Sequence, residues 1–356
     1  MIDITRLVKE EVLAQEAYPI DTRSCRIKLD ANENPFSLPL VVKERMGKLA
    51  EGLALNRYPE PGSPALIKAF SEHLGVEREM LLIGNGSDEL IQVLLTALAP
   101  RLSGGVMIPI PTFAMYKISA LNNSHQVIEI PLDEQFRLKT DEMLQVISAR
   151  QPEIIFLAYP NNPPGNCFET DAVEAIIGAS EGLVVVDEAY VSFSGHTFLP
   201  SLQKYENLVI LRTLSKIGFA ALRVGILIGH PQLVHQLNKV RLPYNLNLFS
   251  QLVALLFLEF EEEFIKHTQR LVSQREILFQ GLEALDGIHP FPSDANFILF
   301  SCFEGKNDVY ERLVNRGVMI KNFPSAGPLR DCMRVTVGTE EENRYFLEAL
   351  RDAVHP

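Results

Sequence analysis

The chain has few cysteines, no long apolar run and a deficit of positive charge. Cys25, Cys167, Cys302 and Cys332 are far apart and form no C-x-x-C pair, so neither a zinc site nor a disulfide framework is indicated, and a reducing cytoplasm fits best. The longest strongly apolar run, Leu252 to Leu258, is too short to cross a bilayer, and the N-terminus lacks an apolar signal core. The net charge of -12 disfavours nucleic acid and anionic membranes as partners, so anionic ligands need local cationic pockets.

The common glycine motifs for nucleotides are also missing. The segment Gly84-Asn-Gly-Ser-Asp-Glu-Leu90 follows a short apolar run and opens a helical pattern, but it has neither the G-x-G-x-x-G nor the G-x-x-x-x-G-K-[ST] spacing. This argues against a nicotinamide dehydrogenase. The backbone N–H groups of Gly86 and Ser87 nevertheless stand where a helix N-terminus binds phosphate. The alternative is that Ser87 is simply the N-cap of the helix.

Helical patterns alternate with short Val/Ile/Leu runs from Pro64 to about Ile298, which is typical of a mostly parallel sheet covered by helices. Strands are expected at 106–110, 127–130, 154–158, 183–186, 208–211 and 225–228. The chain before them predicts a helix over about 4–16 and a loop over 28–35. After a long helical region, about 246–285, strands at 296–300, 318–322 and 333–337 and a helix at about 340–353 predict a smaller α+β domain.

One lysine stands among apolar and small residues directly after the strand-like run 208–211. Partial desolvation makes an amine nucleophilic by lowering its pKa, so the position of Lys216 suits a lysine that forms a Schiff base. The alternative is a lysine whose stem packs while its head reaches water. Ser215 and Arg223 flank Lys216 and are groups that hold a phosphate. Together they indicate an aldehyde cofactor that carries a phosphate, which is pyridoxal phosphate.

Four other residues follow strand-like runs in positions that suit this cofactor. Asp187 would emerge at the carboxyl edge of the sheet and supply the anion that the ring nitrogen needs. Tyr190 and Asn162 can hydrogen-bond the phenolic oxygen, and Phe113 can stack on the ring. Each residue also has an ordinary interpretation, as a helix N-cap, a packed tyrosine, a turn residue or a core phenylalanine.

The motifs resemble those of the fold type I pyridoxal-phosphate aminotransferases, and specifically the histidinol-phosphate aminotransferase family. The resemblance covers nearly the whole chain, and the motifs occur in the expected order. They are Leu29-Asp-Ala-Asn-Glu-Asn-Pro35, Asn56-Arg-Tyr-Pro-Glu-Pro61, 84–89, 159–165, Val186-Asp-Glu-Ala-Tyr190, Thr213-Leu-Ser-Lys216 and Met333-Arg-Val-Thr-Val-Gly-Thr339. The resemblance implies an N-terminal arm, 1–33, that joins the small domain and a dimer interface, a large cofactor-binding domain, 34–245, and a small α+β domain, 246–356.

The resemblance also implies a role for each site residue. Lys216 would bind the cofactor covalently and shuttle the proton at the substrate's Cα, with Asp187 at the ring nitrogen, Asn162 and Tyr190 at the phenolic oxygen and Phe113 on the ring. The cofactor phosphate would take Ser215, Arg223 and the amides of Gly86 and Ser87, and also Tyr58 of a neighbouring subunit, which implies a homodimer with shared active sites. Arg334 and Lys321 would hold the anionic end of the substrate, and Tyr18 and Asn32 would close over it. No metal is implied.

Two positions depart from the family pattern. Many relatives have one more residue between the lysine and the phosphate-binding arginine than separates Lys216 from Arg223, and the family usually has arginine where Lys321 stands. A lysine keeps the charge but loses the planar fork of a guanidinium.

The expected reaction is transamination between L-histidinol phosphate and 2-oxoglutarate, giving imidazole acetol phosphate and glutamate in histidine biosynthesis. An aromatic amino acid aminotransferase, a threonine-phosphate decarboxylase and a non-enzymatic cofactor-binding regulator are the alternatives. The regulator usually carries an added DNA-binding domain, for which this acidic chain has no obvious room.

Overall fold

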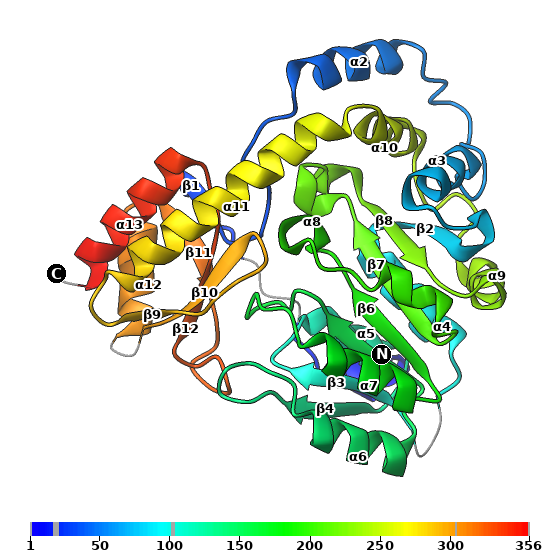
Figure 1. Cartoon of the computed structure of the whole chain (residues 1–356), viewed down its shortest axis with the longest axis horizontal. Helices are drawn as coiled ribbons and strands as arrows, with labels where there is room; N and C mark the ends of the chain where they lie inside the picture. The colour runs from blue at the N-terminus through cyan, green and yellow to red at the C-terminus, as the bar shows by residue number, and fades with distance from the viewer. Residues whose placement is uncertain (1, 17–20, 101–103, 303–304, 355–356) are drawn as a thin grey trace.

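The computed structural model describes residues 2–16, 21–100, 104–302 and 305–354, which form two β-sheets covered by helices (Figure 1). The larger sheet has the strand order β2-β8-β7-β6-β5-β3-β4. Its strands are β2 (Leu81–Asn85), β3 (Val106–Ile110), β4 (Val127–Pro131), β5 (Ile154–Ala158), β6 (Leu183–Asp187), β7 (Leu208–Thr213) and β8 (Val224–Ile228). Only β8 runs against its neighbours. The predicted α/β fold with a mostly parallel sheet is therefore confirmed.

Both faces of this sheet are buried, as a parallel sheet requires. Alternate residues of one strand enter different cores: Ile155 and Leu157 of β5 join one cluster, and Ile154 and Phe156 join the other. The first face is covered by α3 (Pro64–Leu74), α6 (Thr140–Arg150), α7 (Thr170–Ala179) and α10 (Leu248–Glu259). The second is covered by α4 (Gly86–Ala97), α5 (Ala114–Asn122) and α9 (Pro231–Val240).

The smaller sheet has its own core and the order β1-β11-β12-β10-β9. Its strands are β1 (Ile27–Leu29), β9 (Ile288–Pro290), β10 (Phe297–Cys302), β11 (Val318–Asn322) and β12 (Cys332–Thr336). It packs with α11 (Glu261–Glu283), α12 (Lys306–Asn315) and α13 (Glu340–Val354), and α11 reaches from this unit toward the larger sheet (Figure 1). The predicted strand and helix mix at the C-terminal end is confirmed.

Short helices and one longer connecting helix complete the described chain. They are η1 (Ile4–Leu7), α1 (Glu10–Leu13), α2 (Leu40–Glu51), η2 (Arg78–Met80), α8 (Val191–Ser194), η3 (Leu199–Gln203), η4 (Ser215–Ile217) and η5 (Ala220–Leu222). None of the helices in the described ranges is long and apolar enough to cross a bilayer.

Two local predictions were wrong. The expected helix over 4–16 is two short pieces, because its apolar residues have no core to pack against; Leu7, for example, is 77% exposed. The first two residues of the expected loop over 28–35 belong to β1. This strand pairs with β11, which lies about 290 residues further along the chain, so the local sequence could not predict it. The helical region expected over about 246–285 is confirmed as two helices, α10 and α11. They are separated at Phe260, where the backbone leaves the helical conformation before three glutamates begin α11.

Candidate active site

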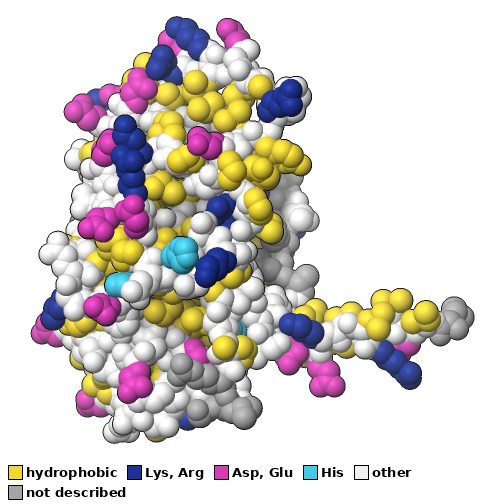
Figure 2. Space-filling view, turned by 90° about the vertical axis from the view of Figure 1, so that its right-hand side faces the viewer, with side chains coloured by type: hydrophobic (Ala, Val, Ile, Leu, Met, Phe, Trp, Pro, Cys, Tyr) yellow, Lys and Arg dark blue, Asp and Glu magenta, His cyan; other side chains and the backbone are white. Residues whose placement is uncertain are grey.

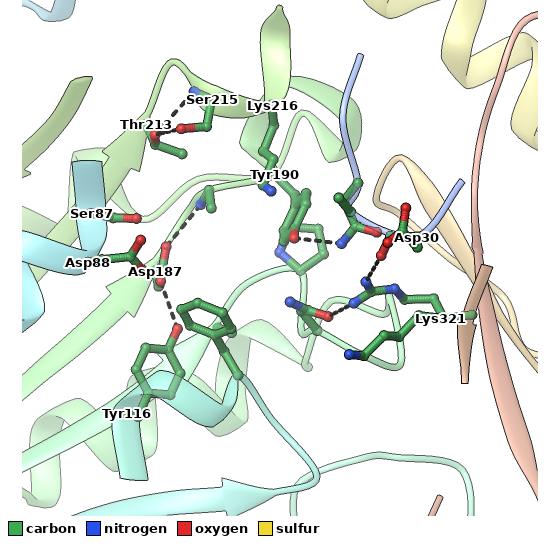
Figure 3. A pocket seen from close by; sticks show the side chains of 18 of the residues that line it. Asp30, Ser87, Asp88, Tyr116, Asp187, Tyr190, Thr213, Ser215, Lys216 and Lys321 are labelled. Atoms are coloured by element: carbon green, nitrogen blue, oxygen red, sulfur yellow. Dashed lines mark hydrogen bonds between the residues drawn. The ribbon is translucent and has the colours of Figure 1, made fainter. Parts of the chain in front are cut away.

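The predicted site residues meet at one edge of the larger sheet. Strands β3, β5, β6 and β7 are parallel, so the residues that follow them come together where these strands end. Because β8 runs the other way, Arg223 reaches the same edge from the residue before the strand begins. A cavity of about 350 Å³ lies there (Figure 3). Eleven predicted residues line it: Asn32, Ser87, Phe113, Asn162, Asp187, Tyr190, Ser215, Lys216, Arg223, Lys321 and Arg334.

Lys216 lies in the short helix η4, three residues after the last residue of β7, and it is half-buried. Its Nζ lies 5.6 Å from the centroid of the Tyr190 ring. Tyr190 is itself buried, and its hydroxyl accepts a hydrogen bond from the Asn32 side-chain amide at 2.9 Å. The lysine amine and the tyrosine ring therefore face the same space (Figure 3).

Asp187 ends β6 as a buried carboxylate with two hydrogen-bond donors from the protein. Its Oδ2 accepts from the hydroxyl of Tyr116 at 2.7 Å, and its Oδ1 accepts from the backbone N–H of Ala189 at 3.1 Å. Burial raises the pKa of Asp187 to about 6, an effect that these hydrogen bonds reduce. A buried acid on a cavity wall is costly unless a cation approaches it, so the site suits a positively charged ring nitrogen.

A second group of residues forms a cradle at the N-terminus of α4. Gly86 has φ +79°, and a Cβ there would lie 2.5 Å from the Arg223 Nη2; one at Gly225 would lie 2.4 Å from the Gly86 carbonyl carbon. Only glycines allow the arginine and the start of α4 to come so close. The guanidinium of Arg223 also lies 3.5 Å from the Ser215 Oγ, and its Nη2 donates to Asp88 at 2.9 Å. A helix N-terminus beside an arginine and hydroxyls fits a phosphate group.

Two cationic side chains of the smaller sheet line the other side of the cavity. Lys321 on β11 and Arg334 on β12 are register partners, so they project from neighbouring strands. Like charges placed opposite each other are unfavourable, and burial together with Arg334 lowers the pKa of Lys321. Arg334 is buried and donates to the Asp30 carbonyl at 2.9 Å and to the Asn162 side-chain oxygen. The pair fits an anion between the two side chains.

Asn32 lines the cavity and also makes structural contacts, whereas two other predicted residues of the described chain are not found in the lining. Asn32 is buried at φ +54° and bonds Thr336 as well as Tyr190, so it ties the N-terminal segment to β12. Gly86 lies behind Arg223 and does not line the cavity. Tyr58 is 79% exposed, stacks on Tyr244 and is not brought to the cavity of its own chain. Tyr18 lies outside the described residues.

Sequence reasoning did not assign roles to Tyr116, Asp88 or Asp30. Tyr116 is completely buried, stacks on Phe156 and meets Phe113 edge to face. Burial and the neighbouring Asp187 raise its pKa well above the usual range, so it stays a hydrogen-bond donor. The position of Tyr116, three residues after Phe113 and on the first turn of a helix, could have indicated that it lies near the site. Its contact with Asp187 depends on the strand order and could not be predicted from the sequence. Within the described ranges, no group of His, Cys, Asp and Glu could hold a metal.

The fold and this cavity define the class to which the protein belongs. The sequence matches the aminotransferase class I and II family over residues 26–350, and the chain belongs to this family. It is 42% identical to histidinol-phosphate aminotransferase 2 of Nitrosococcus oceani over 98% of this chain and 97% of the relative. It is 39% identical to the histidinol-phosphate aminotransferase of Aquifex aeolicus, over 98% of each chain. Within the family the chain therefore groups with the histidinol-phosphate aminotransferases.

Two solved structures support the same fold. The histidinol-phosphate aminotransferase of Sinorhizobium meliloti, solved in complex with pyridoxal-5'-phosphate, superposes with a TM-score of 0.88 at 20% identity and covers 98% of this chain and 97% of its own. The L-threonine-O-3-phosphate decarboxylase of Porphyromonas gingivalis superposes with a TM-score of 0.80 at 19% identity, covering 93% of this chain and 100% of its own. At these identities the likeness concerns the fold alone.

Proposed function

We propose that this chain is a pyridoxal-phosphate-dependent transaminase that exchanges the amino group between L-histidinol phosphate and 2-oxoglutarate, giving imidazole acetol phosphate and glutamate. The observation that carries the proposal is the cavity itself. It presents an amine, Lys216, and a buried acid, Asp187, on one side and two cations on the other. The full-length likeness to histidinol-phosphate aminotransferases supports the choice of substrate.

The residues of this cavity divide between cofactor and substrate. Asp187 would hold the ring nitrogen, Tyr190 and Asn162 the phenolic oxygen, and Phe113 the face of the ring. Ser215, Arg223 and the amides of Gly86 and Ser87 would hold the phosphate. Lys321 and Arg334 would bind the anionic end of the substrate under Asn32 and Tyr18.

When bound, pyridoxal phosphate supplies an electron sink that stabilises negative charge at the substrate's Cα. The chain supplies the proton transfer. Lys216 is the middle residue of η4 and has its amine in the cavity, so it can take the proton from Cα as a base and return it as an acid. Asp187 keeps its charge near the ring nitrogen because Tyr116 and Ala189 donate to its two oxygens. The half-buried walls reduce the access of water to these groups.

We further propose a homodimer in the cytoplasm, in which Tyr58 reaches the phosphate of the partner's cofactor. Tyr58 is one of several large apolar side chains that are exposed in the described chain, and hydrophobic side chains gather on the face that Figure 2 shows. The exposed large apolar residues include Leu40, Val41, Leu55, Tyr58, Leu242 and Tyr244, and Ile4, Leu7, Val12 and Leu13 on the N-terminal segment. All four cysteines are free thiols, which suits a reducing compartment.

The division into an arm (1–33), a large domain (34–245) and a small domain (246–356) is also part of the proposal. β1 supports the attachment of the arm to the small unit, because it adds a strand to the smaller sheet. The first helix of the third segment, α10, packs its Val253 and Phe257 into the larger core, so that segment is held to both units.

A comparison of kcat/KM for four amino donors tests the proposed substrate. L-histidinol phosphate should exceed phenylalanine and tyrosine by at least about 100-fold, because the two cations gain more from a dianionic phosphate than from a monoanionic carboxylate or a neutral ring. Threonine phosphate should give no decarboxylation. A clear preference for an unphosphorylated aromatic amino acid, or release of carbon dioxide from threonine phosphate, would overturn the named activity.

Replacing Arg334 with alanine should lower kcat/KM of both half-reactions by about 100-fold or more, because each substrate loses a buried guanidinium partner. Single-turnover kinetics with glutamate and with L-histidinol phosphate measure the two losses separately. Arg330→Ala is the matched control, since Arg330 is exposed and pairs with Asp331. A defect confined to one half-reaction would refute a shared anchor.

Replacing Tyr116 with phenylalanine should weaken cofactor binding more at low pH than at high pH. The Tyr116 hydroxyl lowers the pKa of Asp187, so its loss raises that pKa further above about 6 and leaves more of the acid neutral. The variant should lose about tenfold in affinity at about pH 6.5 and much less at about pH 8, as measured by fluorescence quenching. Tyr205→Phe, which removes a hydroxyl near Glu174, is the control. Equal losses at both pH values would contradict the assigned role.

A further inference from the structure

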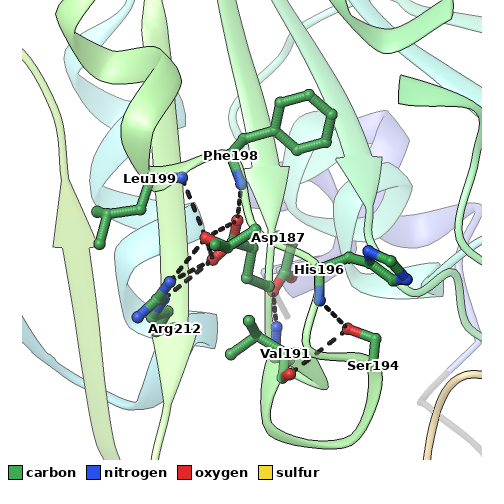
Figure 4. Close-up of polar contacts among 10 residues, drawn as sticks. Asp187, Val191, Ser194, His196, Phe198, Leu199 and Arg212 are labelled. Atoms are coloured by element: carbon green, nitrogen blue, oxygen red, sulfur yellow. Dashed lines mark hydrogen bonds and ion pairs between the residues drawn. The ribbon is translucent and has the colours of Figure 1, made fainter. Parts of the chain in front are cut away.

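Glu188 is a completely buried carboxylate directly beside Asp187, yet it does not line the cavity. Its oxygens accept from the Arg212 Nε at 3.0 Å and Nη2 at 2.8 Å, from the Thr197 hydroxyl at 2.8 and 2.9 Å, and from the Phe198 N–H at 2.6 Å. Arg212 in turn donates to the Thr197 hydroxyl at 2.8 Å. Figure 4 shows Arg212 and Phe198 converging on this point from different segments.

The position of this ion pair in the sheet gives it a geometric role. The pairing of β6 with β7 runs from Val184 and Leu208 to Asp187 and Leu211, and the last contact is the Glu188 N–H on the Leu211 carbonyl. Beyond it, β6 turns to Tyr190 while β7 continues beside β8 to the lysine loop. The pair Glu188–Arg212 therefore joins the two strands just past the end of their backbone pairing.

Stability alone does not explain a buried ion pair. Removing two charges from water is costly, and apolar residues of the same volume often stabilise a protein equally well or better. What the pair adds is direction. The Nε and Nη2 of Arg212 both donate to the Oε2 of Glu188, and Thr197 and Phe198 donate to the same carboxylate, so these donors together fix its orientation. That arrangement fixes the residue after Asp187 relative to a residue four positions before Lys216.

We propose that Glu188 and Arg212 are positioning residues that hold Asp187 and Lys216 at the separation required to grip opposite sides of one cofactor ring. The inference rests on the proposed function. Neither residue touches the cavity, so their effect passes through Asp187 on β6 and through the loop after β7. The other role open to the pair is to anchor the segment 195–199 only, through Thr197 and Phe198.

The variants Glu188→Gln and Arg212→Lys test this role in the holoenzyme. Glu188→Gln keeps the shape and removes the charge; Arg212→Lys keeps the charge and removes the fork. For Glu188→Gln we expect kcat to fall by about 10- to 100-fold, with KM for both substrates changed by less than about threefold. We also expect a shift of about half a unit or more in the pH midpoint of the visible cofactor band, and a raised Kd for the cofactor. Arg212→Lys should show the same changes to a smaller extent.

Val173→Ala is the control, because Val173 is fully buried in α7 and its loss lowers the melting temperature without touching the strand ends. It should keep the wild-type band midpoint and kcat. If Glu188→Gln folds and matches Val173→Ala in midpoint and kcat, the pair is only a structural anchor and the inference fails. If Glu188→Gln does not fold, the same comparison is decided by Arg212→Lys. Failure of the proposed function is distinct, since the wild-type protein would then show no cofactor band.

Discussion

Replacing Lys216 with alanine should abolish transamination, by at least about 10⁴-fold in kcat, while leaving the protein folded and able to bind pyridoxal phosphate non-covalently. The variant removes the amine that faces the cavity and, with it, both covalent attachment and proton transfer at Cα. The cradle at the N-terminus of α4, with Arg223, and the acid at Asp187 remain, so some affinity for the cofactor should persist. Steady-state assays and equilibrium dialysis measure the two properties.

A surface lysine provides the matched control for this variant. Lys204 lies outside the cavity and pairs with Glu174, so Lys204→Ala should retain wild-type turnover and cofactor content. Full activity of the Lys216 variant would reject the assignment. If the melting curve shows that Lys216→Ala does not fold, the experiment is repeated with Lys216→Arg. This variant keeps the charge and the stem of the side chain and should still be inactive.

Replacing Asp187 with asparagine should reduce kcat by about 100- to 1,000-fold and weaken cofactor binding, although the side chain keeps its shape. The ring nitrogen would face a neutral amide in place of a carboxylate, and a fixed charge in a buried site has an effect of this order. Because burial raises the pKa of Asp187 to about 6 before the cofactor is bound, uptake of the cofactor by the wild-type protein should weaken as the pH drops through this value. The variant should lack that acidic limb in its pH profile of cofactor uptake.

The control for Asp187→Asn is Asp133→Asn. Asp133 also accepts backbone hydrogen bonds, but it lies in a turn with Arg137 and does not line the active-site cavity. It should match the wild type in kcat and in the pH profile. An Asp187→Asn enzyme that kept both the rate and the acidic limb would show that another group titrates near pH 6.

Sequence patterns predicted the larger sheet well because its strands are local and apolar. The runs at 154–158 and 183–186 are short and surrounded by helical patterns, and polar groups follow each of them. Since parallel strands end at one edge, the positions of Asn162, Asp187 and Lys216 in the sequence were enough to predict that they meet.

Contacts between distant segments could not be predicted from local patterns. β1 forms only because β11 offers it an edge, and Tyr116 reaches Asp187 only because β3, β5 and β6 are adjacent. The Glu188–Arg212 pair depends in the same way on the pairing of β6 with β7. The lysine at 321 was visible as a charge, but its placement opposite Arg334 follows from the register of β11 and β12.

Reduction of the holoenzyme with borohydride, followed by peptide mass spectrometry, tests the central claim most directly. Reduction should remove the visible absorbance band and leave one pyridoxyl-phosphate group on the peptide that contains Lys216, with no label on Lys321 or Lys306. A colourless protein that does not take up the cofactor, or a label on a different lysine, would contradict the account.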